Sequence, residues 1–366
     1  MYIWGIWILC SLGTQSSDLD ASRNMQWVRD AHAISDAIVT EISDRWQEKS
    51  HWEPKKYPHN QSPQPGGRTA FAVLALLSSG VPSQRKDVDA ALTSLEGCEL
   101  EGTYAIAARI MAFSRLPESR LSQVKRDVRL LVNAFHYENT GWGYSVRSPA
   151  TRFDPCICQF VALALSDAKD RGIDVPTKIF DWLRSAFIHH QQNDGGWSYQ
   201  LHGKSRGSMT AAGYATLSIC QRHSPASKSM ANTERNARDR AFTWLVAHAN
   251  ANSNPNARSW IDYWLLSIGR AVDASGQEYF GDFNAYINGS HSISRRLMTR
   301  DTDGWKVRAN SIRIEKLCFA VLFLERATSP IAIGWMSCHK EAAPPFALEE
   351  ITRKLSRELE LTLKWR

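Results

Sequence analysis

Hydrophobic residues recur along this chain at intervals of three and four, in two alternating kinds of segment. In residues 24–48 the apolar positions, such as Val28 and Ile34, occupy one face only, which is typical of an amphipathic α-helix. In residues 69–77 nearly every position is apolar, which predicts a helix that is buried on all sides. Glycine and proline residues such as Pro82 separate such segments. The chain is therefore predicted to alternate amphipathic helices with nearly all-apolar ones.

This alternation continues to about residue 326 and yields six helix pairs. The amphipathic, outer helices are predicted at residues 24–48, 85–97, 120–137, 176–192, 236–250 and 276–300. The apolar, inner helices are predicted at residues 69–77, 103–114, 155–168, 208–221, 258–270 and 309–326. Six pairs can close into a ring, so that no terminal pair has to cap the array. We therefore predict an all-α fold, an (α/α)6 toroid of six inner and six outer helices over residues 24–330, with a C-terminal extension at 331–366.

A turn of similar sequence recurs between the two layers. Its copies read Asn139-Thr140-Gly141-Trp142-Gly143-Tyr144, Asn193-Asp194-Gly195-Gly196-Trp197-Ser198-Tyr199 and Asp301-Thr302-Asp303-Gly304-Trp305. Each copy ends an amphipathic segment and precedes an apolar one, which indicates an internal repeat. An indole is large, flat and carries one N–H donor, so it can hold one helix against the next. For Trp142, Trp197 and Trp305 we favour this structural role over contact with a ligand.

Bulk composition narrows the possible functions. The chain has 366 residues, 43% of them hydrophobic, and a net charge of +7. Its basic residues are scattered without a dense run, which argues against a nucleic-acid partner. No apolar segment is long enough to span a bilayer, so no transmembrane helix is predicted. Of the seven cysteines, Cys220 and Cys318 fall within apolar helical segments, where cysteine is usually a small buried hydrophobe.

The first seventeen residues resemble a secretory signal peptide. Residues 1–13 are apolar and uncharged, and small and polar residues follow them. The stretch has the character of the hydrophobic region of such a peptide, although no Lys or Arg precedes it. We therefore predict that residues 1–17 direct export to the periplasm or the extracellular space. A buried N-terminal segment is the alternative.

The repeated turns also carry a family resemblance. The segment from Gln191 to Trp197 resembles the Gln-and-Trp repeat of squalene cyclases and other terpenoid cyclases, and protein prenyltransferase β subunits share the same repeat logic. The stretch from Trp142 through Asp154 to Gly213 is similar to a narrower group of bacterial toroids, the prenyltransferase or squalene-oxidase repeat proteins, whose activity is uncharacterised. This resemblance covers about residues 25–366. It implies the toroid fold and says little about activity.

A toroid of this kind implies a cavity at one end, lined by the starts of the inner helices and by the turns before them. Aromatic walls suit an apolar or cationic ligand, through burial and cation–π contact. We therefore predict that an apolar or glycan small ligand, or a protein partner, binds at this mouth. The candidate ligand-binding residues are Tyr104, Trp142, Tyr144, Asp154, Trp197, Tyr199, Trp260, Tyr263 and Trp305.

Two enzymatic alternatives follow from the resemblance. Cyclases that start by protonation use an Asp-x-Asp-Asp cluster with one carboxyl kept protonated, and the nearest match here is the shorter Asp301-Thr302-Asp303. Protein prenyltransferases bind zinc through Asp-x-Cys and a later His. Asp154-Pro155-Cys156 has the first spacing, and His202 is the nearby imidazole.

We favour a structural interpretation of the Asp-Pro-Cys motif. Asp154 would cap the inner helix, Pro155 would occupy its first turn, and Cys156 would pack against its neighbours. No cofactor is then predicted, and zinc bound by Asp154, Cys156 and His202 is the alternative.

Carbohydrate processing is a third alternative. Asp154, Glu138, Asp194 and Asp262 could supply paired carboxylates beside stacking aromatic rings. Spacing along the chain does not establish which carboxylates face each other. The candidate catalytic residues, over all the enzymatic alternatives, are Asp154, Asp194 and Asp303.

Overall fold

The predicted all-α class is confirmed by the computed structural model of the chain. The structure describes residues 8–9, 18–49, 52–54, 64–136, 141–148, 150–200, 203–328, 331–333 and 363–365. The inner helices are α2 (Gly67–Ser78), α4 (Thr103–Phe113), α6 (Pro155–Asp170), α8 (Gly207–His223), α10 (Ile261–Ser275) and α12 (Ile314–Ala327). The outer helices are α1 (Asp18–Lys49), α3 (Lys86–Gly97), α5 (Leu121–Asn133), α7 (Thr177–His189), α9 (Lys228–His248) and α11 (Ala285–Leu297). A short 3₁₀ turn, η1 (Glu118–Arg120), precedes α5.

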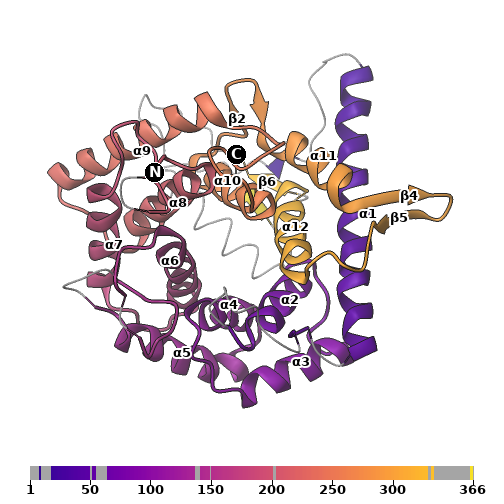
Figure 1. Cartoon of the computed structure of the whole chain (residues 1–366), viewed down its shortest axis with the longest axis horizontal. Helices are drawn as coiled ribbons and strands as arrows, with labels where there is room; N and C mark the ends of the chain where they lie inside the picture. The colour runs from indigo at the N-terminus through magenta and orange to yellow at the C-terminus, as the bar shows by residue number, and fades with distance from the viewer. Residues whose placement is uncertain are drawn as a thin grey trace, which may run out of the picture.

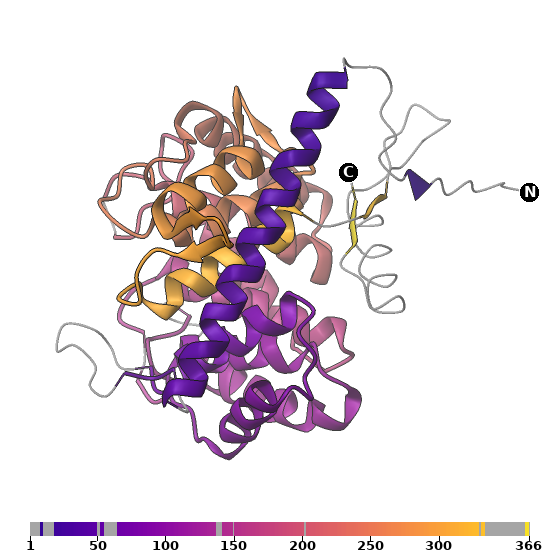
Figure 2. The same cartoon turned by 90° about the vertical axis from the view of Figure 1, so that its right-hand side faces the viewer.

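The six inner helices form a closed ring inside the outer ones (Figure 1). Each inner helix packs against the inner helices before and after it in sequence, and α12 packs against α2. Helix α1 crosses the outside of this last contact and touches both α12 and α2 (Figure 2). The burial follows the two sequence patterns. Helix α8 is buried from Gly207 to Cys220, whereas α5 buries one face, with Val124 and Val128 on it.

Five aromatic side chains from five inner helices meet inside the ring. The members of this aromatic layer are Phe71, Tyr104, Phe160, Tyr263 and Phe319. The ring centroid of Phe160 lies 5.5 Å from that of Phe71, 5.3 Å from that of Tyr104 and 5.8 Å from that of Tyr263. Phe319 completes the layer, with centroids 5.5 Å from Phe71 and 6.0 Å from Tyr263. All five residues belong to the first two turns of their helices, so the inner helices start at the same end of the ring.

Indole N–H groups fasten the turns between the layers to the outer helices. Trp142 and Trp197 are each 1% exposed, and their Nε1 atoms donate to the carbonyl oxygens of Leu131 and Phe187, both at 2.8 Å. The partners lie 11 and 10 residues earlier, near the end of the preceding outer helix. Trp52 donates in the same way to the carbonyl of residue 42, at 2.8 Å. The repeated turn therefore serves as a structural fastening at these positions.

Glycine is required on both sides of the Trp197 fastening. Gly195 has a φ of 91°, which side chains other than glycine rarely adopt, and a Cβ there would approach the carbonyl oxygen of Arg240 to 2.7 Å. Gly213 lies in α8 where a Cβ would meet the indole of Trp197 at 2.6 Å. The indole can therefore lie directly against the inner helix.

Two buried arginines also join the layers. Arg109 in α4 donates Nε and Nη2 to the two carboxylate oxygens of Asp127 in α5, each at 2.7 Å, and Nη1 to two backbone carbonyls. Arg184 in α7 donates Nε to Glu234 in α9 at 2.6 Å, and Nη2 to two carbonyls at the end of α8. Each buried guanidinium is thus matched by a carboxylate and by backbone acceptors, as burial of a charge requires.

The single outer helix predicted at residues 276–300 is wrong in part. Strands β2 (Tyr279–Phe280) and β3 (Phe283–Asn284) form a short hairpin first, and α11 begins only at Ala285. The side chain of Asn284 accepts a hydrogen bond from the backbone N–H of Ile287 at 2.9 Å and caps the helix there. Helix α11 ends at β4 (Met298–Asp301), which pairs with β5 (Gly304–Val307), so the third copy of the turn is a β-hairpin.

A small three-stranded sheet lies beside the ring (Figure 2). Strand β1 (Ile8–Leu9) is antiparallel to β6 (Ile331–Ile333), and β6 is parallel to β7 (Leu363–Trp365). The remainder of the predicted signal peptide, residues 1–17, and most of the extension, residues 331–366, lie outside the described residues. None of the described helices combines the length and the apolar character needed to cross a membrane.

The same substitution at two tryptophans should have different effects on stability. Trp197→Phe leaves the buried carbonyl of Phe187 without its donor, so we expect the free energy of unfolding to fall by about 1–3 kcal/mol. Trp305→Phe removes an indole N–H that has no hydrogen-bond partner, so we expect stability to stay the same or to rise. Urea denaturation of both variants, followed by circular dichroism, measures the difference. Equal losses in the two variants would contradict the fastening role of Trp197.

Candidate functional site

The candidate site is the end of the ring at which the inner helices start, called the mouth below. Its floor is the aromatic layer. Its rim consists of residues at or just before the starts of α4, α6, α8, α10 and α12. Because the N-terminal end of a helix carries partial positive charge, five aligned starts make this end of the ring electropositive.

A cavity of about 430 Å³ lies at the mouth beside α10 and α12. The residues that line it are Arg258, Ser259, Trp260, Ile261, Asp262, Arg313, Lys316 and Phe319. Phe319 connects this cavity to the aromatic layer. Trp260 is 52% exposed and has a left-handed backbone, with φ 67°. For a bulky residue this conformation costs about 1–3 kcal/mol and is typical of ligand-binding positions.

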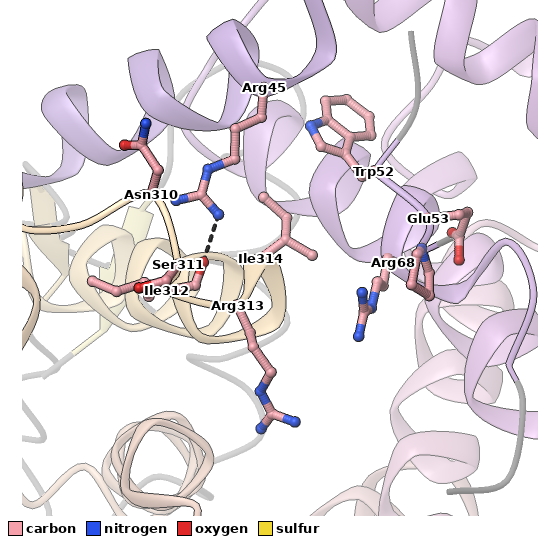
Figure 3. A pocket seen from close by; sticks show the side chains of 10 residues that line it. Arg45, Trp52, Glu53, Arg68, Asn310, Ser311, Ile312, Arg313 and Ile314 are labelled. Atoms are coloured by element: carbon pink, nitrogen blue, oxygen red, sulfur yellow. Dashed lines mark hydrogen bonds between the residues drawn. The ribbon is translucent and has the colours of Figure 1, made fainter. Parts of the chain in front are cut away.

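A second cavity, of about 600 Å³, lies between α1, α2 and the start of α12 (Figure 3). Arg45, Arg68 and Arg313 surround it, together with Trp52 and Glu53. Nη1 of Arg45 donates to the carbonyl of residue 312 at 2.5 Å, and Nε of Arg68 donates to the carboxylate of residue 315 at 2.9 Å. Arg313 lines both cavities, so the two adjoin along the rim.

Arginines of the chain itself lie near the faces of two aromatic rings of the rim. The guanidinium carbon of Arg313 lies 5.0 Å from the ring centroid of Trp260. Those of Arg152 and Arg206 lie 5.1 Å and 5.5 Å from the ring centroid of Tyr199. A cationic ligand at these rings would meet a repulsive charge and compete with an arginine for the ring face.

Several cations of the rim have no acidic partner. In the part of the chain that the structure describes, no carboxylate forms an ion pair with Arg206, Arg258, Arg313 or Lys316. Arg206 and Arg313 are the residues immediately before α8 and α12, and Lys316 lies in the first turn of α12. A cation raises the electrostatic energy at a helix start, where an anion lowers it. The rim is therefore arranged to attract negative charge.

Asp154 is the buried carboxylate of the mouth. Its Oδ1 accepts hydrogen bonds from the backbone N–H groups of Cys156 and Ile157, at 2.9 Å and 3.2 Å, which confirms the predicted helix cap with Pro155 in the first turn. Its Oδ2 is buried without a hydrogen bond and lies 3.6 Å from Nη2 of Arg152. Burial raises the pKa of Asp154, although the cap bonds and Arg152 act in the opposite direction.

Tyrosine hydroxyls lie beside Asp154 on the rim. The hydroxyl groups of Tyr144 and Tyr199 are hydrogen-bonded to each other, and the rings of Tyr104 and Tyr144 are 5.9 Å apart. Burial is the main reason that the pKa values of all three phenols are raised. The hydroxyl groups are therefore neutral at physiological pH and can both donate and accept hydrogen bonds.

The thiol of Cys156 is held inside the mouth. Its Sγ–H donates to the hydroxyl of Tyr263 at 3.3 Å, and that hydroxyl donates to Oε1 of Gln159 at 2.7 Å. Burial raises the pKa of Cys156 to about 12, so the thiolate that acts as a nucleophile or zinc ligand is not the stable form. His202 lies outside the described residues, and within the described ones no three His, Cys, Asp or Glu side chains form a metal-binding group. The zinc alternative stays a prediction.

The other acidic candidates have structural partners. Asp194 accepts a hydrogen bond within its turn from the backbone N–H of Gly196 at 3.0 Å, and others from the hydroxyl of Ser205 at 2.7 Å and the indole of Trp244 at 3.1 Å. Asp262 lies 2.7 Å from Arg296, and the exposed Asp303 lies 3.3 Å from a lysine of its hairpin. Glu138 lies outside the described residues. Among the described carboxylates of this set, none is hydrogen-bonded to another.

The structure thus brings together only part of the predicted binding residues. Tyr104, Tyr144, Asp154, Tyr199, Trp260 and Tyr263 belong to the mouth, whereas Trp142 and Trp197 are buried fastenings and Trp305 lies in the β4–β5 hairpin. The basic rim was not predicted from the sequence. The signal was an arginine at the position before an inner helix, as in Arg206 and Arg313, where Ser, Thr, Asp or Asn is the usual residue.

Comparison with known proteins bears on the fold. No protein-family model matches the sequence. The structure is similar to the crystal structure of a sugar epimerase from a ruminal bacterium, with a TM-score of 0.52 and 10% sequence identity, over 81% of this chain and 98% of that one. At this identity the similarity concerns the fold alone. The resemblance to terpenoid cyclases and prenyltransferases stays a prediction.

The buried charge of Asp154 should be visible in the pH dependence of stability. Because its pKa is raised in the folded protein, the folded state holds a proton that the unfolded chain has already lost. The contribution of Asp154 to the stability of the wild-type protein should therefore fall as the pH rises from 3.8 through the raised pKa. Asp154→Asn keeps a capping oxygen but cannot ionise, so its stability relative to wild type should rise between about pH 4 and 7.

Asp194→Asn is the matched control for this measurement. Hydrogen bonds from Ser205 and Gly196, acting against burial, lower the pKa of Asp194 below 3.8. Its contribution to stability is therefore complete above pH 3.8 and is lost only at lower pH. The difference between Asp194→Asn and wild type should be constant from about pH 4 to 7. A constant difference for Asp154→Asn as well, in urea unfolding over that range, would contradict the buried charge.

Proposed function

We propose that the mouth binds an anionic carbohydrate, meaning a small saccharide that carries a carboxylate, phosphate or sulfate group. The observation that supports this most directly is the basic rim. Arg206, Arg258, Arg313 and Lys316 lack ion-pair partners within the described residues and surround the starts of α8, α10 and α12. An anion would meet both these cations and the positive ends of the helices.

The same rim argues against an apolar or a cationic ligand. An apolar ligand over Arg258, Arg313 and Lys316 would remove water from three unpaired charges and return no hydrogen bonds, which is costly. A cationic ligand would be repelled, and arginine side chains already lie on the faces of Trp260 and Tyr199. A negatively charged polar ligand is the class that avoids both penalties.

The shape and the aromatic content of the mouth favour a saccharide among anionic ligands. A volume of about 430 Å³ is within the usual range for small-molecule sites. The half-exposed indole of Trp260 offers an apolar edge beside polar groups, which suits a sugar ring with its apolar C–H face and its hydroxyl groups. The hydroxyls of Tyr144 and Tyr199 can donate and accept hydrogen bonds. The similarity to a sugar epimerase concerns the fold and is compatible with this class of ligand.

The proposal concerns binding and leaves catalysis aside. Asp154 has a raised pKa and is the mouth residue closest in character to a general acid. A second carboxylate hydrogen-bonded to it, however, is absent from the described residues. Binding, in contrast, requires only the rim, the floor and the cavity.

Calorimetric titration should detect the charge preference. We expect D-glucuronate, glucose 6-phosphate or digalacturonate to bind the full chain more tightly than neutral D-glucose, with an affinity that falls as salt concentration rises. Arg313→Gln removes a cation that lines both cavities, and it should weaken binding of the anionic sugars by about tenfold or more. Trp260→Ala should weaken all the sugars that bind.

Arg129→Gln is the control for net charge. Arg129 is exposed on the outer helix α5 and lines neither cavity, so its loss should leave the affinities unchanged. Two results would count against the proposal: no preference for the anionic sugars over D-glucose, or equal affinities in wild type, Arg313→Gln and Trp260→Ala.

A further inference from the structure

A buried arginine lies deeper in the ring, on the far side of the aromatic layer from the mouth. Arg270 follows Tyr263 by seven residues in α10, which is two helical turns and about 11 Å further along the ring. Its guanidinium carbon lies 5.6 Å from the ring centroid of Phe160, and the residue is 6% exposed. It therefore belongs to the interior of the ring rather than to the rim.

Arg270 differs from the other deeply buried arginines because two of its guanidinium nitrogens have no hydrogen-bond partner. Its Nε and Nη1 atoms are buried without a hydrogen bond, and no carboxylate of the described residues forms an ion pair with it. Arg109 and Arg184, in contrast, each have a carboxylate within 2.7 Å and additional backbone acceptors. A buried guanidinium without acceptors is rare, because its desolvation is not compensated.

The acidic residues nearby are engaged by other groups. Asp273 accepts from Nη1 of Arg326 at 2.7 Å and from the hydroxyl of Tyr286 at 2.8 Å. Asp167 lies 3.3 Å from Nη1 of Arg115. Neither carboxylate forms an ion pair with Arg270, although the negative charge of both favours its charged form from a distance. Burial, and then the neighbouring Arg326, lowers the pKa of Arg270 to about 9, so its guanidinium is still charged at neutral pH.

The C-terminal ends of the helices explain why arginines occur at these positions. They do not explain why Nε and Nη1 of Arg270 have no hydrogen-bond acceptor. Arg270 and Arg326 lie in the last two turns of α10 and α12, where the partial negative charge of helix ends favours cations. That field provides no hydrogen-bond acceptor to Nε or Nη1 of Arg270. A planar or tetrahedral oxyanion would supply both the charge and the acceptors, in the paired geometry that a guanidinium favours.

We propose that a small oxyanion, such as phosphate, sulfate or the carboxylate group of a small acid, binds to Arg270 inside the ring. This site is separate from the mouth, because the aromatic layer lies between them. Arg326 lies beside it with its charge paired to Asp273, and the face of Phe160 forms one wall. The proposal does not depend on the function proposed for the mouth.

The test uses variants that separate the two sites. Arg313→Gln serves as the background, because it weakens anion binding at the mouth while Arg270 stays intact. Titration of this variant with inorganic phosphate, sulfate, acetate and chloride at constant ionic strength identifies which anion binds. We expect saturable binding of at least one oxyanion, together with a saturable rise in the midpoint of thermal unfolding.

Adding Arg270→Gln to this background should abolish both effects. Arg270→Lys, which keeps the charge but lacks the fork of N–H donors, should weaken oxyanion binding by about tenfold or more and serves as the test if the Gln variant does not fold. The inference is wrong if unfolding of the background variant does not respond to any anion, or if Arg270→Gln or Arg270→Lys binds as tightly. If the wild-type protein binds these oxyanions and Arg313→Gln alone binds none of them, the anion site lies at the mouth; that result would likewise overturn the inference, whereas the function proposed for the mouth would stand.

Discussion

The contact between the first and last inner helices holds the ring together. The rings of Phe71 in α2 and Phe319 in α12 lie 5.5 Å apart, and the ion pair of Arg68 with Glu315 lies beside the same junction. Each inner helix is apolar on nearly every side, so an open array would leave one helix at each end exposed to water. Closure removes both exposed ends at once. It requires contacts between residues as far apart as 290 positions, such as Ser35 and Glu325, and is therefore the most costly step in chain entropy.

Closure also determines the electrostatics of the molecule. Because the inner helices alternate with outer ones, all of them start at the mouth and end on the other side of the ring. Arginines at helix ends, such as Arg326, are favoured by the helix dipole, whereas Arg206 and Arg313 at helix starts are opposed by it. The aromatic layer separates these two environments. The cations at the mouth are therefore opposed by the helix dipoles, and a bound anion would offset this electrostatic cost.

The alternation of outer and inner helices was predicted well from the sequence. A helix with apolar residues on one face differs from a helix that is apolar on every face in its own residues, so the signal is local. The hairpins around α11 were not predicted. The residue that caps the helix, Asn284, lies inside the stretch 276–300 that was predicted to be helical throughout. The basic rim was missed for a different reason. Arg258 lies beside Arg313 and Lys316 only because α12 packs against α10, and Arg206 precedes α8, the next inner helix of the ring. Trp197 belongs to the repeated turn, which is easy to recognise in the sequence. The tryptophan of that turn fastens the turn to an outer helix and does not line a binding site.

The pairing of Arg313 with Trp260 explains how one side chain can both exclude and attract ligands. A guanidinium that lies over an aromatic ring contacts it through its face, and its N–H groups point outward in the plane of the group. The covered ring is closed to a cationic ligand, while the outward N–H groups remain available to an anion. Stacking also restricts the arginine before a ligand arrives, so less side-chain entropy is lost on binding. Trp260, whose backbone is left-handed, thus lies beside the arginine that lines both cavities.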